Sequence, residues 1–180
     1  MGTECLTTKL INGCKRASIL HIELNSNSLN KKLFTELNDV LSFVEQFQAT
    51  GEKDSIDGVV FSSKKDNIFL AGADLFEMKE LLDLDDRFLG EVINMGQQTF
   101  NRIEDLKIPT VACINGICLG GGYELSLACN YRIASEDAKI GLPEVNYSDF
   151  KECNIIYIGT HGDRGANNAD IIFVLDFNNL

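Results

Sequence analysis

The sequence of 180 residues predicts an α/β fold in which short strands alternate with helices. Residues 17–24 alternate between apolar and polar side chains, which is typical of a half-buried strand. Residues 29–48 carry leucines at helical spacing, and residues 110–114 form a short apolar run typical of a strand inside a parallel sheet. Strands and helices that alternate in this way favour crossover connections and helices packed on a parallel sheet.

The first strand is predicted over residues 17–24, where Leu20, Ile22 and Leu24 share one face. His21 then lies on the opposite face of that strand. Because the apolar face packs against the core, we expect His21 to have a structural role and not a catalytic one.

A polar loop at residues 25–28 can cap the next helix, which is predicted over residues 29–48. Gly51 suits the end of that helix. Residues 57–62 contain a short apolar run and predict a second strand, and residues 67–70 predict a further extended segment.

Residues 75–106 are mostly helical in pattern, with an acidic break at residues 83–86. Pro109 ends this helical segment. The run at residues 110–114 is continuously apolar, so we expect this strand to be buried on both faces.

The remaining elements are short. Residues 122–129 predict the start of a helix, and residues 132–135 and 138–141 predict two strands. Residues 147–180 show no amphipathic helix, although they end in an apolar run suited to a terminal strand. The chain therefore divides into a core at residues 1–146 and a different C-terminal tail at residues 147–180.

The composition excludes several classes of partner. The net charge of −11 argues against non-specific binding to nucleic acid or to an anionic membrane surface. No apolar run approaches the roughly 18 residues that a membrane span needs, and the N-terminus lacks the features of a signal peptide. We therefore expect a cytoplasmic protein without a membrane span.

The cysteines and histidines do not suggest a metal site. No CxxC pair occurs and the chain has two histidines, so we expect no zinc site. We interpret the six cysteines as reduced thiols that pack in the interior, with a catalytic cysteine as the alternative. They are Cys5, Cys14, Cys113, Cys118, Cys129 and Cys153.

A glycine-rich turn at residues 120–122 carries the strongest chemical signal in the chain. Glu124 follows the glycines by two positions, and Glu144 follows the sequence Gly-Leu-Pro. Carboxylates in apolar surroundings have raised pKa values that suit proton transfer, and N–H groups at a helix start favour negative charge. The pattern predicts acid–base chemistry on a substrate that develops an oxyanion. The alternative is an ordinary turn with two surface carboxylates.

Three segments, taken in this order and spacing, resemble the crotonase superfamily, which is the enoyl-CoA hydratase/isomerase family. They are residues 69–75 (FLAGADL), residues 108–125 (IPTVACINGICLGGGYEL), and residues 129–135 (CNYRIAS) with 141–144 (GLPE). The resemblance extends from about Ile11 to Asn146 and implies a crotonase-like ββα superhelix, truncated or divergent at its C-terminal end.

The resemblance also implies an oxyanion hole for the thioester oxygen of an acyl-CoA. By motif position, its two donors are the backbone N–H groups of Ala71 and Gly121. Losing one such donor typically costs about 3–4 kcal/mol of barrier. The residues implied in substrate binding are Ala71, Gly72, Ala73, Asp74, Gly120 and Gly121.

The two glutamates narrow the reaction that the resemblance implies. In hydratases of this family, residues at the positions of Glu124 and Glu144 hold a water and add it across the double bond of a 2-enoyl-CoA in fatty-acid β-oxidation. Which glutamate is the acid and which is the base stays open. The alternative is an isomerase that converts a 3-enoyl-CoA to a 2-enoyl-CoA. Family isomerases often need only one carboxylate, the counterpart of Glu144, to move a proton between carbons. CoA enters as part of the substrate, and neither a cofactor nor a metal is implied.

The family pattern ends after Asn146. In relatives, the helices that follow cover the acyl pocket and form the trimer contact, so the family's trimers and hexamers are not clearly implied here. The segment ending in Asp74 is similar to the hydratase half of multifunctional fatty-acid oxidation proteins, so the chain is either a monofunctional relative or a piece of a longer one. A third interpretation is an inactive, truncated acyl-CoA binder or interaction protein.

Contacts to CoA are less specific in the sequence. The loop at residues 25–29 is shorter than the family's proline-containing version, which helps to bind CoA. Lysines at 31–32, 64–65 and 79 are candidate partners for the CoA phosphates, with a solvated surface as the commoner interpretation.

Overall fold

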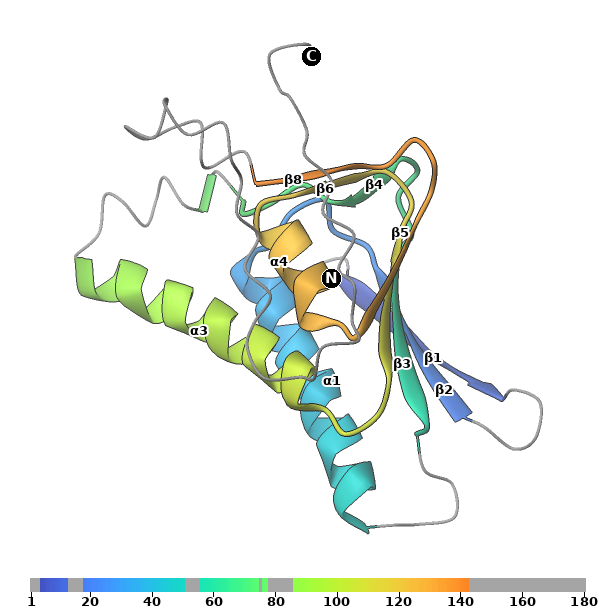
Figure 1. The fold of residues 1–180 in the computed structure, drawn as a ribbon. Helices are drawn as coiled ribbons and strands as arrows, with labels where there is room; N and C mark the ends of the chain where they lie inside the picture. Colours follow the sequence, from blue (N-terminus) through green and yellow to red (C-terminus); the bar gives the residue numbers. More distant parts are fainter. Residues whose placement is uncertain (1–3, 13–17, 51–55, 75, 78–85, 143–180) are drawn as a thin grey trace, which may run out of the picture.

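A computed structural model describes residues 4–12, 18–50, 56–74, 76–77 and 86–142. The chain repeats a unit of two strands followed by a helix (Figure 1). The elements are β1 Leu6–Asn12, β2 Ser18–Leu24, α1 Lys31–Thr50, β3 Gly58–Ser63, β4 Ile68–Leu70, α3 Asp86–Asp105, β5 Thr110–Ile114, β6 Ile117–Leu119, α4 Gly121–Ala128, β7 Tyr131–Ala134 and β8 Lys139–Gly141.

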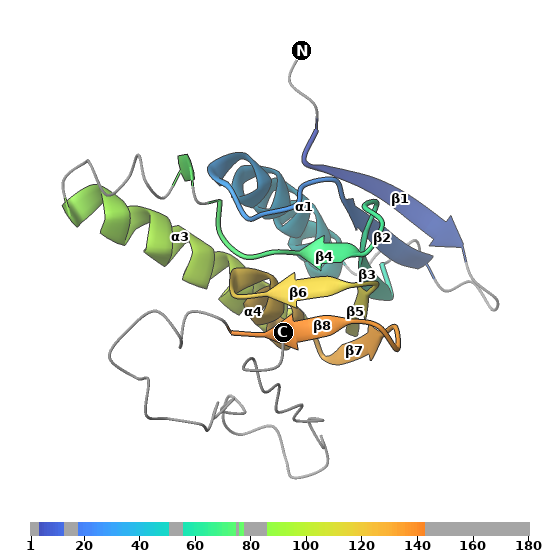
Figure 2. The same ribbon diagram turned by 90° about the horizontal axis from the view of Figure 1, so that it is seen from above.

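The strands form two sheets. The larger has five strands in the order β1-β2-β3-β5-β7, in which β1 runs antiparallel to β2 and the other pairs are parallel. The smaller sheet contains β4, β6 and β8, all parallel, and Figure 2 shows these strands side by side. The second strand of each of the last three units therefore leaves the large sheet and joins the small one. This places the ends of β4 and β6 next to each other.

Helices α1, α3 and α4 lie on one side of the large sheet (Figure 1). The core between them is built from the alternate residues of β2 and β3 that face inward, such as Ile22 and Phe61, which are both fully buried. Leucines of α1 at positions 33, 37 and 41 are also fully buried. Each such side chain contributes about 1.5–3 kcal/mol through burial, so this layer supports the strand ends where the site lies.

A polar cluster joins α1 to α3. The Arg102 guanidinium donates two hydrogen bonds of 2.9 Å to the carboxylate of Glu45, one of 2.6 Å to Asn38 Oδ1 and one of 3.0 Å to Ser42 Oγ. The hydrogen bonds to Glu45 raise the pKa of Arg102. The planar guanidinium of Arg102 on α3 thus binds three side chains of α1 and holds the two helices together.

Most predicted elements are confirmed. The strand predicted over residues 17–24 is β2, the helix over residues 29–48 is α1, and the run at residues 110–114 is β5. His21 lies on the face predicted for it and forms a 2.7 Å hydrogen bond with Ser62 Oγ on β3. This contact between two strands supports the structural role expected for His21.

One expectation about a strand was wrong, and two strands were missed. β5 is buried on one face only, because Val111 and Cys113 point away from the helices and are half-buried. β1 and β6 were not predicted. β1 is an edge strand with mostly exposed side chains, and β6 has three residues whose pairing depends on β4 and β8.

No helix in the described part of the chain is long and apolar enough to cross a membrane. The predicted tail at residues 147–180, together with the boundary at residue 146, lies outside the described residues.

Candidate active site

The glycine-rich turn connects β6 directly to α4. Gly120 has φ 52° and ψ −128°, a conformation that a residue with a side chain rarely adopts. Its carbonyl accepts hydrogen bonds from the N–H groups of Tyr123 at 2.8 Å and Glu124 at 3.0 Å. The first N–H groups of a helix have no acceptor within the helix, and Gly121 is the first residue of α4. Gly121 therefore presents a donor at the positive end of the helix dipole.

The next glycine lets α4 approach β4. A Cβ atom on Gly122 would overlap the backbone carbonyl oxygen of Leu70 and would lie 2.6 Å from its Cβ atom. Because backbone cannot move aside as a flexible side chain does, position 122 requires glycine for this packing. The contact between Gly122 and Leu70 therefore determines how closely α4 packs against the end of β4.

The second predicted motif, residues 71–74, follows β4 and pairs with the loop that precedes α1. The Leu29 N–H donates to the Gly72 carbonyl at 2.8 Å, and the Asp74 N–H donates to the Leu29 carbonyl at 2.8 Å. Ser28 Oγ donates to Asp74 Oδ2 at 3.0 Å. Gly72 has φ 91°, which allows the chain to turn here. The backbone of this motif is thus held by the loop at residues 25–29.

Asp74 caps the helical turn that follows it. Its Oδ1 atom accepts hydrogen bonds from the N–H groups of Phe76 at 3.0 Å and Glu77 at 3.2 Å. The hydrogen bond from the Glu77 backbone is the largest of the effects that lower the pKa of Asp74. The carboxylate predicted to help bind substrate therefore contacts protein backbone and the Ser28 hydroxyl.

The N–H of Ala71, the other predicted oxyanion donor, is already used within the protein. It donates to the carbonyl of Asn27 at 2.7 Å. The Leu70 carbonyl oxygen is the atom nearest to the position of a Cβ on Gly122, so that carbonyl faces α4. The C=O and N–H of one trans peptide point in opposite directions, so the Ala71 N–H points away from α4. Its predicted role would require exchange of the bond to Asn27.

Glu124 lies in the first turn of α4, and its side chain is exposed among the described residues. Its neighbours in sequence do not supply the apolar surroundings expected from them, because Tyr123 and Leu125 turn into the core instead. Successive residues of a helix point about 100° apart, so sequence neighbours do not share a face. A Cβ atom on Gly121 would lie 3.6 Å from Glu124 Oε2, so the carboxylate folds back over the start of the helix.

Several predicted residues cannot be placed. Glu144 and Lys79 lie outside the described residues, and so do Cys14 and Cys153. Of the other candidate lysines, Lys32 lies 3.6 Å from the Glu36 carboxylate.

The buried cysteines have the packing role that was predicted. Burial raises the pKa of both the Cys118 and the Cys129 thiols to about 12. Thiols with such pKa values are protonated at neutral pH and are poor nucleophiles. Within the described ranges, no group of three or more histidine, cysteine, aspartate or glutamate side chains is arranged to hold a metal ion.

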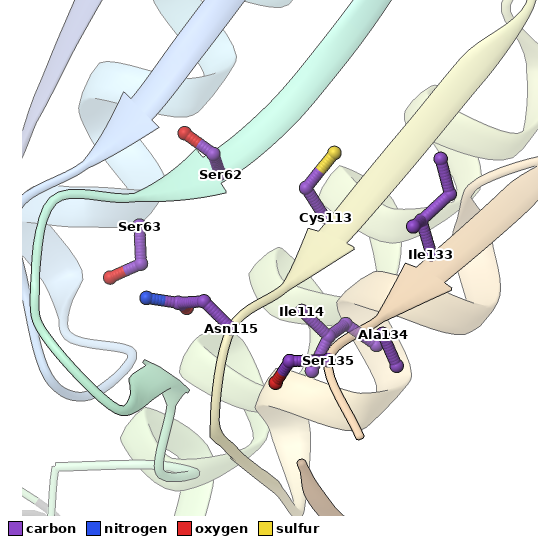
Figure 3. A pocket seen from close by; sticks show the side chains of 8 residues that line it. All are labelled: Ser62, Ser63, Cys113, Ile114, Asn115, Ile133, Ala134 and Ser135. Carbon is purple, nitrogen blue, oxygen red and sulfur yellow. The ribbon is translucent and has the colours of Figure 1, made fainter. Parts of the chain in front are cut away.

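A cavity of about 290 Å³ lies at the carboxyl ends of β3, β5 and β7 (Figure 3). None of its lining residues was predicted for the substrate site, and Cys113 was considered only under the alternative of a catalytic cysteine. Asn115 donates from Nδ2 to the Lys65 carbonyl at 2.7 Å. The lining is formed by Ser62, Ser63, Cys113, Ile114, Asn115, Ile133, Ala134 and Ser135. The cavity is thus separate from the turn that carries Gly121 and Glu124.

Comparisons with known proteins agree with the resemblance. Residues 15–158 match the model of the family described as enoyl-CoA hydratase/isomerase. The fatty acid oxidation complex subunit alpha of Pseudomonas putida (strain GB-1) is 44% identical over 126 residues, which are 70% of this chain and 17% of that protein. The corresponding subunit of Ectopseudomonas oleovorans is 43% identical over the same length.

Solved structures give the same result for the fold. The crystal structure of an enoyl-CoA hydratase from Bacillus anthracis has a TM-score of 0.66 at 32% identity, covering 80% of this chain and 52% of that chain. An enoyl-CoA hydratase/isomerase from Xanthobacter autotrophicus Py2 has a TM-score of 0.68 at 26% identity, covering 79% and 50%. The chain therefore spans about half the length of these solved structures and 17% of the curated relatives above.

Proposed function

Because the chain belongs to the enoyl-CoA hydratase/isomerase family, we propose that it hydrates the double bond of a 2-enoyl-CoA thioester in fatty-acid oxidation. One observation carries this proposal. Gly121 opens α4, and Glu124 Oε2 would lie 3.6 Å from a Cβ atom on Gly121, so the proposed hydrogen-bond donor and the proposed proton-transfer group belong to the same helix start. Hydration needs both, one at the thioester oxygen and one at the neighbouring carbons.

The Gly121 N–H stabilises the charge that develops on the thioester oxygen. When water adds to the β-carbon, electron density moves through the conjugated system onto this oxygen, giving an enolate. A donor at a helix start is oriented before the reaction begins, so little reorganisation is needed in the transition state. Removing one such donor typically lowers kcat by about 100- to 1000-fold.

The second donor of the proposed hole is the Ala71 N–H. The Gly121 N–H belongs to the first residue of α4, whereas a bound thioester would have to recruit Ala71 from its 2.7 Å hydrogen bond with Asn27. Such recruitment requires movement of the loop at residues 25–29 or rotation of the peptide between Leu70 and Ala71. The two donors therefore differ in how much of their role is already built into the fold.

Glu124 and Glu144 complete the proposed reaction. One carboxylate takes a proton from the attacking water, and the other gives a proton to the α-carbon. Two carboxyl groups that share one water have separated pKa values, so that one acts as base while the other acts as acid. The position of Glu124 Oε2, which would lie 3.6 Å from a Cβ atom on Gly121, supports this role for Glu124.

Loss of the crotonyl-CoA enone absorbance, measured with the full 180-residue chain, tests the proposal. Since general acid–base groups contribute about 100- to 10,000-fold, Glu124→Gln and Glu144→Gln should each lower kcat by that factor while crotonyl-CoA still binds. Glu91→Gln, at an exposed position on α3, is the control and should keep kcat. Saturable binding without turnover by the parent chain would overturn the hydratase proposal in favour of an acyl-CoA binder.

The family description also includes isomerases, so the two reactions need to be separated. A 3-enoyl-CoA substrate distinguishes them. An isomerase that uses the single carboxylate of Glu144 should convert it to the 2-enoyl-CoA even in Glu124→Ala. A hydratase should lose its hydration of crotonyl-CoA in the same variant. Product analysis by mass and chromatography reads out both results.

A further inference from the structure

The side chain of Leu29 lies directly against the backbone of Gly121. Leu29 is 5% exposed, so it is part of the buried core although it belongs to a loop. A Cβ atom on Gly121 would lie 2.5 Å from Leu29 Cδ1 and 3.9 Å from Leu29 Cγ. Leu29 therefore fills the space that a side chain at position 121 would need.

The backbone conformation does not explain glycine at position 121. Among the described residues, the glycines with positive φ are Gly72 and Gly120. Gly121 is the first residue of α4, a conformation that alanine adopts readily. A Cβ at position 121 would require Leu29 Cδ1 to move, so the two positions are sterically coupled.

The loop that carries Leu29 is itself held in place. The Leu29 N–H donates to the Gly72 carbonyl at 2.8 Å. The Leu29 carbonyl accepts from the Asp74 N–H, also at 2.8 Å. The neighbouring Asn27 carbonyl accepts the Ala71 N–H at 2.7 Å. One short loop therefore packs its Leu29 side chain against the residue Gly121 and accepts the Ala71 N–H with its Asn27 carbonyl.

We infer that Leu29 is a positioning residue for the Gly121 N–H, an inference that rests on the proposed function. Leu29 prevents the first turn of α4 from shifting toward the loop, and so it fixes the direction of that N–H. The carboxylate of Glu124 also lies near this position, since its Oε2 would be 3.6 Å from a Cβ on Gly121. A displacement of about 1 Å in a catalytic group can lower a rate by about 100-fold, so this packing should affect kcat more than substrate binding.

The first test is Leu29→Ala, assayed with crotonyl-CoA. By the same misplacement argument, we expect kcat to fall by about 10- to 100-fold while KM changes by less than about threefold. Leu41→Ala is the matched control, because Leu41 is fully buried on α1 and the three atoms nearest to a Cβ on Gly121 belong to Leu29 and Glu124. It should lower the midpoint of thermal unfolding and leave kcat unchanged. Leu29→Met, which keeps the apolar volume, should retain most of the activity.

The second test is a double-mutant cycle with Gly121→Ala. In the parent background, the added methyl meets Leu29 Cδ1 and should lower kcat. In the Leu29→Ala background, the same methyl enters vacated space, so the double variant should be more active than the product of the two single effects predicts. If Leu29→Ala does not fold, Leu29→Val, which removes a single methylene, replaces it in both tests.

The inference is overturned if Leu29→Ala keeps the parent kcat while its thermal midpoint falls as it does in Leu41→Ala. Additive effects of the changes at positions 29 and 121 would overturn it as well. A parent chain that does not turn over crotonyl-CoA would instead overturn the proposed function, and the inference with it. An active parent with an equally active Leu29→Ala overturns the inference alone.

Discussion

Two glycine-containing turns, at residues 71–74 and 120–124, follow neighbouring strands of the small sheet but differ in what their backbone groups contact. The turn after β6 leads straight into α4, which leaves the Gly121 N–H at a helix start. The turn after β4 is paired with the loop at residues 25–29, and the Ala71 N–H is donated to Asn27. The comparison teaches that similar glycine motifs can have different roles: one turn presents a donor, and the other anchors the loop that packs against it.

The largest expected difference between the turns concerns the two backbone donors. Replacing the amide by an ester at Gly121 removes its N–H and should lower kcat by about 100- to 1000-fold. The same replacement at Ala71 should mainly cost stability, about 0.5–1.5 kcal/mol for the lost hydrogen bond to Asn27. Steady-state kinetics and urea unfolding of the two semisynthetic chains measure both effects. Equal losses of kcat would show that a bound thioester recruits Ala71, and the distinction between the turns would fail.

A second prediction concerns how the turn after β6 packs. Gly122→Ala places a methyl group on the Leu70 carbonyl oxygen, so α4 must move away from β4. We expect a loss of about 1–3 kcal/mol in the free energy of unfolding, as for other overpacked sites. Gly90→Ala is the control, because a Cβ there meets nothing within 4 Å and Gly90 lies inside α3. It should stabilise the chain by about 0.5–1 kcal/mol in the same urea titration.

The smallest effect is expected at the turn after β4. Asp74→Ala removes the cap on the N–H groups of Phe76 and Glu77 and should cost about 1 kcal/mol at neutral pH. The pKa of Asp74 is lowered from its ordinary value of 3.8, so the carboxylate contributes stability above that value. This contribution is lost as the pH falls through the lower folded-state pKa.

Urea titrations of the parent and of Asp74→Ala across this pH range measure the effect. The difference in unfolding free energy between the two chains should shrink at acid pH. Asp74→Asn, which keeps a capping oxygen without a charge, should differ from Asp74→Ala by an amount that does not depend on pH. A parent–alanine difference that grows at acid pH would contradict the assigned cap.

Much of the fold could be predicted from the sequence because periodicity reports burial. The leucines of α1 and the alternation in β2 follow directly from which side chains are buried. β1 has a single neighbour in its sheet and mostly exposed side chains, so it has no apolar face to detect. β6 is too short for any pattern, and its strand character comes from the strands on either side.

The site was only partly predictable. Glycines at positions 120 and 122 were recognisable as a tight turn. The structure shows that Gly120 is needed for its positive φ and Gly122 for the close approach to Leu70. The direction of the Ala71 N–H could not be predicted, because the orientation of a peptide in a turn depends on partners far away in the chain, here the Asn27 carbonyl. The contact of Leu29 with Gly121 joins residues from separate units of the fold, and no local pattern reveals it.

The most direct test of the central claim is the infrared carbonyl stretch of crotonyl-CoA, labelled with ¹³C at the thioester carbon and bound to the chain. A hydrogen bond from the Gly121 N–H polarises this carbonyl, so the stretch should move to lower frequency on binding. The shift should largely disappear in the chain with an ester at Gly121. A bound thioester whose carbonyl frequency is the same as in water, or whose shift survives that replacement, would contradict the account.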